Sequence, residues 1–81
     1  MLVTVRLFAR LRDIAGASDI RLRLDDGATA GDAWAALIAR YPDLAAHSAS
    51  ISCAVNEEYA RMTAPLGEGD EVAFLPPVSG G

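Results

Sequence analysis

Residues 29–42 have the sequence TAGDAWAALIARYP, and they predict the main helix of the chain. Its start, Thr29 to Asp32, resembles a capping sequence in which a hydroxyl and a carboxylate satisfy the first free N–H groups. Pro42 is expected to end the helix, because proline cannot continue the hydrogen-bonding pattern. Apolar side chains fall on one helical face, which we expect to pack on a sheet: Ala33, Trp34, Leu37, Ile38 and Tyr41.

Two strands are predicted before this helix. In residues 2–9 apolar and polar side chains alternate, which is typical of a strand with one buried face. Residues 10–16 favour a short helical turn that ends at Gly16. Residues 20–24 show the clearest alternation in the chain and predict a second strand, in a hairpin-like pair with the first.

Three more extended segments are predicted after the helix, beyond a connection at residues 44–50. They are a strand at residues 51–55, an edge segment that begins at Tyr59 after a polar turn, and a last strand at residues 71–75. Pro76 and Pro77 end this last strand, because proline has no N–H to donate to a sheet.

The predicted order of elements indicates an α+β fold. A chain of 81 residues forms one compact domain, and one helix can cover one face of a mixed sheet of four to five strands. By analogy, this order is that of the ubiquitin-like β-grasp fold. We therefore expect a β-grasp domain at residues 1–75 and a flexible, extended C-terminal tail at residues 76–81.

Charge and composition exclude several classes of protein. The net charge is −4 and all seven basic residues are arginines, which argues against nucleic-acid binding. Without lysine the chain offers no side-chain amine for a Schiff base or an isopeptide bond. One cysteine, no signal peptide and only short apolar runs lead us to expect a cytoplasmic protein that does not enter a membrane.

Before the C-terminal residues, the sequence contains no pattern typical of an enzyme active site. One histidine and one cysteine make a metal site improbable, and no glycine pattern typical of nucleotide binding follows a strand, so we expect no bound cofactor. Cys53 falls with the apolar side chains of its strand, which favours a small core residue over a nucleophile. His47 is expected to be an exposed residue after the helix.

The C-terminal residues differ from the rest. Gly80 and Gly81 carry no Cβ, so such an end can pass through a narrow channel in another protein. From Leu75 the tail can reach roughly 20 Å, at about 3.3 Å per residue. It would deliver the Gly81 carboxylate to a partner's site, and that carboxylate needs activation, for example as an acyl-adenylate. The residues expected to insert are Pro76, Pro77, Val78, Ser79 and Gly80.

Residues 70–81, DEVAFLPPVSGG, closely resemble the end of the small, sulfur-carrying subunit of molybdopterin synthase. The resemblance continues at LFARLRD, residues 7–13, and at AVN, residues 54–56, and length and element order match over essentially the whole chain. It implies a non-catalytic sulfur carrier in molybdenum cofactor biosynthesis.

The resemblance also implies a cycle and its partners. An adenylyltransferase related to ubiquitin-activating enzymes would adenylate the Gly81 carboxylate with ATP. A persulfide donor, either a sulfurtransferase or a cysteine desulfurase, would then convert it to a thiocarboxylate. Docked in the large catalytic subunit, in a heterotetramer, the thiocarboxylate would give its sulfur to cyclic pyranopterin monophosphate.

A partner-binding surface is expected on the side of the sheet away from the core. Phe8 and Leu75 have the parity opposite to Leu7 and Phe74, and Tyr59 starts the nearby edge segment. In the resembling family the positions that match Phe8, Tyr59 and Leu75 form an apolar patch that binds the partner. Exposed apolar residues that gather on one face usually mark an interface.

Three other functions stay open. One is a thiamine-pathway sulfur carrier of the same fold, and another is a ubiquitin-like modifier whose Gly81 is joined to a target lysine. The third is a structural binding module with an incidental tail, which predicts that loss of Gly80 and Gly81 leaves function intact.

Overall fold

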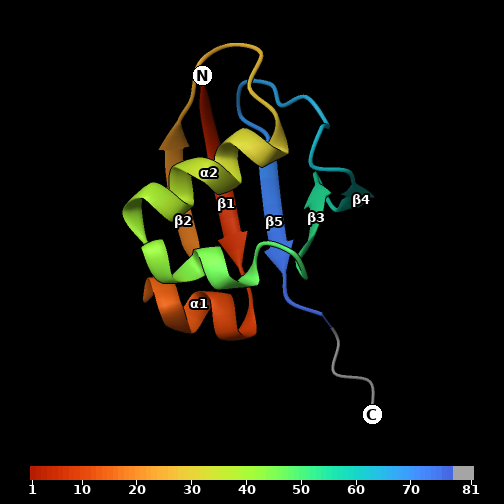
Figure 1. The fold of residues 1–81 in the computed structure, drawn as a ribbon. Coiled ribbons are helices and arrows are strands. Elements are labelled where there is room, and N and C mark those ends of the chain that lie inside the picture. Colours follow the sequence, from red (N-terminus) through yellow and green to blue (C-terminus); the bar gives the residue numbers. More distant parts are fainter. Residues whose placement is uncertain (78–81) are drawn as a thin grey trace.

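The structure, a computed structural model, describes residues 1–77, in which helices pack against a mixed five-stranded sheet (Figure 1). The predicted α+β fold is confirmed. The elements in chain order are β1 (Leu2–Leu7), α1 (Ala9–Ala15), β2 (Asp19–Arg23), α2 (Ala30–Arg40), the 3-10 helix η1 (Pro42–His47), β3 (Ser52–Val55), β4 (Glu58–Ala60) and β5 (Glu71–Leu75).

The first and last strands of the chain lie side by side in the middle of the sheet. The strand order is β2-β1-β5-β3-β4, with β1 parallel to β5 and every other neighbouring pair antiparallel (Figure 1). Both edges of β5 are therefore paired, whereas β2 and β4 each have one unpaired edge. The strand that leads into the C-terminal residues is thus held on two sides.

Helix α2 crosses one face of the sheet and closes the core (Figure 1). Trp34 and Leu37 are buried, and the Trp34 ring lies 5.0 Å from the ring of Phe74 in β5, measured between centroids. The indole N–H of Trp34 donates a hydrogen bond to Ser48 Oγ at 2.9 Å, so its one polar atom is satisfied. The predicted packing face is confirmed, with Ile38 and Tyr41 half-buried at its rim.

The start of α2 has the predicted cap. Thr29 Oγ1 accepts a hydrogen bond from the Asp32 N–H at 3.2 Å, and Asp32 Oδ2 accepts one from the Thr29 N–H at 2.8 Å. This reciprocal arrangement satisfies two donors that a helix start would otherwise leave free.

The structure corrects three of the predictions made from the sequence. The strand expected over residues 2–9 ends at Leu7, because Phe8 is the N-cap of α1 and Ala9, with φ 50°, turns the chain into that helix. The pair of β1 and β2 is antiparallel as expected, but α1 lies in its connection, so it is no tight hairpin. His47, expected to be exposed, is half-buried at the end of η1.

Within residues 1–77, the longest helices are too short and too polar to cross a membrane.

Substitution of the capping residue should lower stability without changing the fold. Thr29→Ala removes the oxygen that accepts from the Asp32 N–H, and we expect a loss of about 1 kcal/mol in the free energy of unfolding. Urea denaturation followed by circular dichroism measures it. Thr63→Ala is the matched control, because Thr63 is exposed, and an equal loss in both variants would contradict the role of the cap.

Candidate docking face and C-terminal arm

The sheet has a covered face and an open face. Alternate residues of β1, such as Val5 and Leu7, are buried in the core, while Arg6 between them is exposed. In β5 the same alternation buries Val72 and Phe74 and turns the residues between them to the other side. The predicted partner-binding residues belong to this open face.

Phe8 lies where β1 ends and α1 begins. Its backbone is extended, with φ −125° and ψ 151°, and its side chain is 37% exposed. The guanidinium carbon of Arg6 lies 5.6 Å from the centroid of the Phe8 ring, so the ring is on the side to which Arg6 points. A cation at this distance is attracted by the face of the ring.

Tyr59 is the most exposed large apolar residue of the described chain, with 81% of its surface accessible. It sits in the edge strand β4, directly opposite Ala54 of β3, which in turn lies opposite Ala73 of β5. Ala73 is opposite Arg6 of β1, so one row of side chains runs across the open face. The side chains in the middle of this row are short, because Ala73 and Ala54 lie between the long side chains of Arg6 and Tyr59.

Leu75 is the last residue of β5 and is half-buried. It lies opposite Ser52 of β3 and shares the parity of Ala73. Half-buried Pro76 and exposed Pro77 follow it. The predicted arm therefore begins at the end of β5, the central strand of the sheet, next to the open face.

The open face thus carries an apolar surface, which we call the docking face: Phe8, Ala54, Tyr59, Ala73 and Leu75. The structure puts all three predicted residues on it, although a whole strand, β3, separates Tyr59 from Leu75. Ala54 and Ala73 were missed by the sequence reasoning. The sequence shows that Ala73 shares the parity of Leu75 and that Ala54 has the parity opposite to Cys53 in its own strand. It does not show the pairing of β3 with β5, which joins the two alanines.

The start of β5 is fixed by a small polar network. Asn56 donates from Nδ2 to Asp70 Oδ1 at 3.1 Å, and its Oδ1 accepts from the Glu71 N–H at 3.0 Å. Asp70 Oδ2 also accepts from the Gly67 N–H at 2.8 Å. These hydrogen bonds, with that from Asn56 first, lower the pKa of Asp70 below its ordinary value, because they stabilise the carboxylate. The network joins the β3–β4 turn to β5.

Four of the predicted arm residues lie outside the described residues. They are Val78, Ser79, Gly80 and the proposed reactive Gly81.

Cys53 is a core residue, as the sequence predicted. It is buried in β3, and its Sγ lies 3.2 Å from the carbonyl oxygen of Ala60, to which the thiol donates. Burial raises the pKa of the thiol, so it stays protonated and is a poor nucleophile.

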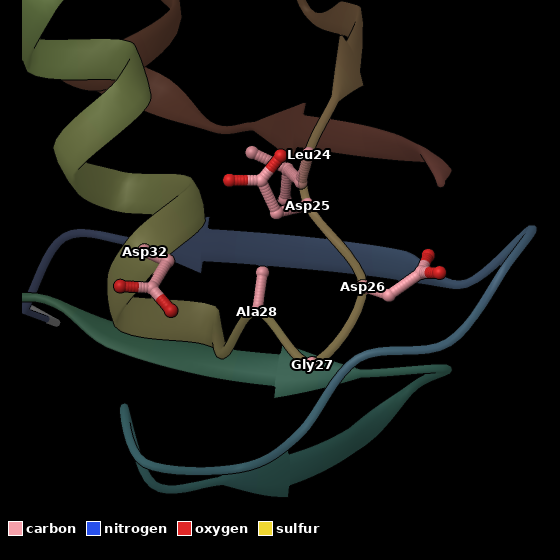
Figure 2. Close-up of a pocket in the computed structure, with 6 residues that line it drawn as sticks. All are labelled: Leu24, Asp25, Asp26, Gly27, Ala28 and Asp32. Atoms are coloured by element: carbon pink, nitrogen blue, oxygen red, sulfur yellow. The ribbon is translucent and has the colours of Figure 1, made fainter.

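A pocket lies between the end of β2 and the start of α2 (Figure 2). This connection is at the end of the sheet opposite to the end of β5 (Figure 1). Its charged lining residues are Asp25, Asp26 and Asp32. Figure 2 shows the carboxylates of Asp26 and Asp32 pointing away from each other, and Asp32 is already used by the helix cap. Within residues 1–77 no three His, Cys, Asp or Glu side chains are grouped to hold a metal ion.

Comparison with known proteins gives one consistent family. Residues 5–81 match the ThiS family. The molybdopterin synthase sulfur carrier subunit of Chlamydomonas reinhardtii is 40% identical over 83 residues, which cover 100% of both chains. The small archaeal modifier protein 1 of Haloferax volcanii is 37% identical over 84 residues, which cover 94% of this chain and 97% of that relative.

The solved structures agree with this result. The crystal structure of SAMP1 from Haloferax volcanii superposes with a TM-score of 0.87 at 35% identity, over 100% of both chains. The predicted ubiquitin-like β-grasp fold is confirmed.

Loss of the Asp70 carboxylate should destabilise the protein at neutral pH but not in acid. The pKa of Asp70 is lower in the folded chain than its ordinary value of 3.8, so its contribution is present above that value and is lost as the pH falls through the folded pKa. We expect Asp70→Asn to unfold at lower urea than the wild type at about pH 7, with the gap closing in acid. Asp13→Asn, at an exposed helical position, is the control, and a gap independent of pH would contradict the prediction.

Proposed function

Because the chain belongs to the ThiS family, we propose that it is a sulfur carrier of molybdopterin synthase, acting as its non-catalytic small subunit. The observation that carries the proposal is the match to a sulfur carrier subunit over the full length of both chains. The C-terminal sequence FLPPVSGG supports it, because a glycine pair offers a carboxylate with no side chain to obstruct its entry into a narrow site.

In the proposed cycle the Gly81 carboxylate attacks the α-phosphate of ATP on an adenylyltransferase, which gives the acyl-adenylate and pyrophosphate. The terminal sulfur of a persulfide on a sulfurtransferase or cysteine desulfurase then displaces AMP. A second thiol cleaves the S–S bond of the resulting acyl disulfide and leaves the thiocarboxylate on Gly81. This chain supplies only the acyl group, because its thiol is buried and it has no lysine.

The thiocarboxylate would then transfer its sulfur to cyclic pyranopterin monophosphate inside the large subunit. In this step a carbon–sulfur bond forms on the pterin substrate as a carbon–oxygen bond of the same carbon breaks, and the oxygen leaves with the bonding electron pair. Water then cleaves the acyl–sulfur bond, which leaves the sulfur on the pterin and restores the carboxylate on Gly81. In this proposal the docking face binds the large subunit while Pro76 to Gly81 enter its active site. The central position of β5 supports this role, because it fixes the base of the arm relative to the docking face.

The test is the intact mass of the chain after incubation with ATP, the adenylyltransferase and a persulfide donor. We expect a gain equal to the replacement of one oxygen by sulfur, located at Gly81 by fragmentation. The matched control lacks Gly80 and Gly81 and should fold normally but gain no sulfur. A wild-type mass that stays unchanged with competent partners would overturn the proposal.

The docking face predicts a second result. Tyr59→Ala should weaken binding to the large subunit by at least about tenfold, because a largely exposed ring that becomes buried is typical of an interface anchor. Stability should change little, by about 0.5 kcal/mol or less, since the ring is exposed. Isothermal titration calorimetry measures the affinity, and Tyr59→Phe, which keeps the ring, is the control. Equal affinity of the alanine variant and the wild type would remove Tyr59 from the interface.

Two related functions share the activated carboxylate. The similarity to small archaeal modifier protein 1 favours a ubiquitin-like modifier, in which a lysine amine of a target would displace AMP from the adenylate. The same mass experiment separates it, because it yields a covalent adduct to a protein amine. A thiamine-pathway carrier would form the thiocarboxylate but would not convert the pterin substrate.

A further inference from the structure

Three arginines project from the open face at the β2 side of the sheet. Arg21 and Arg23 belong to the exposed parity of β2, and Arg6 belongs to that of the neighbouring strand β1. Arg21 lies opposite Thr4, and Arg6 lies opposite Asp19, so Arg6 and Arg21 are diagonal neighbours. We call Arg6, Arg21 and Arg23 the basic strip.

The charges of the basic strip are unequally compensated. Arg6 has two carboxylates nearby, with its Nε 3.3 Å from Asp19 Oδ1 and its Nη1 4.0 Å from Glu71 Oε1. Arg21 and Arg23 form no ion pair with any group of residues 1–77. The described part of the chain contains all eleven acidic residues of a protein with net charge −4, so these two positive charges stand out against an acidic background.

The basic strip is continuous with the docking face. Arg6 lies opposite Ala73 in the sheet, and its guanidinium stacks 5.6 Å from the centroid of the Phe8 ring. One surface therefore runs across the sheet from the arginines of β2, over Arg6, to the apolar residues of β5, β3 and β4. A polar, charged rim beside an apolar centre is the usual anatomy of a protein interface.

We propose that the basic strip binds carboxylates of the large subunit, in the same docking event that places the apolar residues. This inference rests on the proposed function. It adds that the partner's surface has acidic side chains, which bind Arg21 and Arg23, next to an apolar area. Guanidinium groups suit such contacts, because they can bind a carboxylate through two parallel N–H groups.

Charge complementarity at a rim acts mainly on association and orientation. Opposite charges steer the encounter and disfavour a wrong orientation, whereas the apolar centre holds the complex together. Here the orientation matters, because a rotated domain would carry the arm away from the channel it must enter. A polyanion such as a nucleic acid fits less well, since three arginines would face it from a protein with an excess of acidic groups.

The experiment measures binding of the full chain to the large subunit by surface plasmon resonance at about 0.05 M and about 0.5 M NaCl. Arg21→Glu/Arg23→Glu should weaken binding at low salt by about tenfold or more, chiefly through slower association. The difference from the wild type should shrink at high salt, where the charges are screened. Arg21→Lys/Arg23→Lys, which keeps both charges, should bind much closer to the wild type than the reversed variant.

The matched control is Arg40→Glu, compared with Arg21→Glu alone, because both variants make the same change of net charge and Arg40 is exposed on α2, which covers the other face of the sheet (Figure 1). It should stay within about twofold of the wild type, because Arg40 lies outside the interface. Circular dichroism checks that every variant folds. Equal weakening by Arg21→Glu and Arg40→Glu would show an effect of net charge alone and overturn the inference, as would binding of the wild type that is insensitive to salt.

The proposed function and the role of the basic strip are overturned by different results. Wild-type chain that does not bind the large subunit at all would overturn the proposed function and this inference with it. Wild-type binding that survives Arg21→Glu/Arg23→Glu would overturn only the inference. Retention of the wild type, but not of the reversed variant, on single- or double-stranded DNA would also overturn it, by showing that the strip binds phosphates.

Discussion

The parallel pairing of β1 with β5 is the constraint on which the rest of the structure depends. It joins segments from the two ends of the chain, with Val5 beside Val72 and Leu7 beside Phe74 in the core. Parallel neighbours need a long connection, and here that connection contains the remaining strands and α2. Because β5 is also paired with β3, the strand that leads to Pro76 cannot shift without breaking hydrogen bonds on both of its edges.

As a result of this arrangement, the two faces of the sheet differ in what they contact. One face is covered by α2 and forms the core around Trp34 and Phe74. No helix of residues 1–77 covers the other face, which carries apolar side chains at one side and arginines at the other. A small domain buries little apolar surface, so apolar residues left exposed on one face reduce the stability it can gain from burial. Good packing on the covered face has to compensate for this loss of stability. The absence of buried polar or charged residues among those described agrees with such a core.

The chemistry of the described residues agrees with a carrier whose reactions take place on other proteins. The one thiol is held inside the core with a raised pKa, which makes it a poor nucleophile. In the pocket at the far end of the sheet the carboxylates of Asp26 and Asp32 point away from each other, and Asp32 is committed to a helix cap (Figure 2). In the proposed function the domain contributes geometry: β5 is paired on both edges up to Leu75, and the adjoining surface has both apolar and basic parts.

The sequence by itself determined most of the elements and the end of the last strand. Alternation marked β2 and β5, the Thr29–Asp32 pair marked the start of α2, and two prolines marked the end of the last strand, because each of these signals acts between residues close in the chain. Only the tertiary structure decided that α1 begins directly after Phe8, that Ala54 and Ala73 join Tyr59 to the middle of the sheet, and that Arg6 links the apolar and basic parts. These features depend on strand order and register, which are set by contacts between residues far apart in the sequence and leave no local pattern.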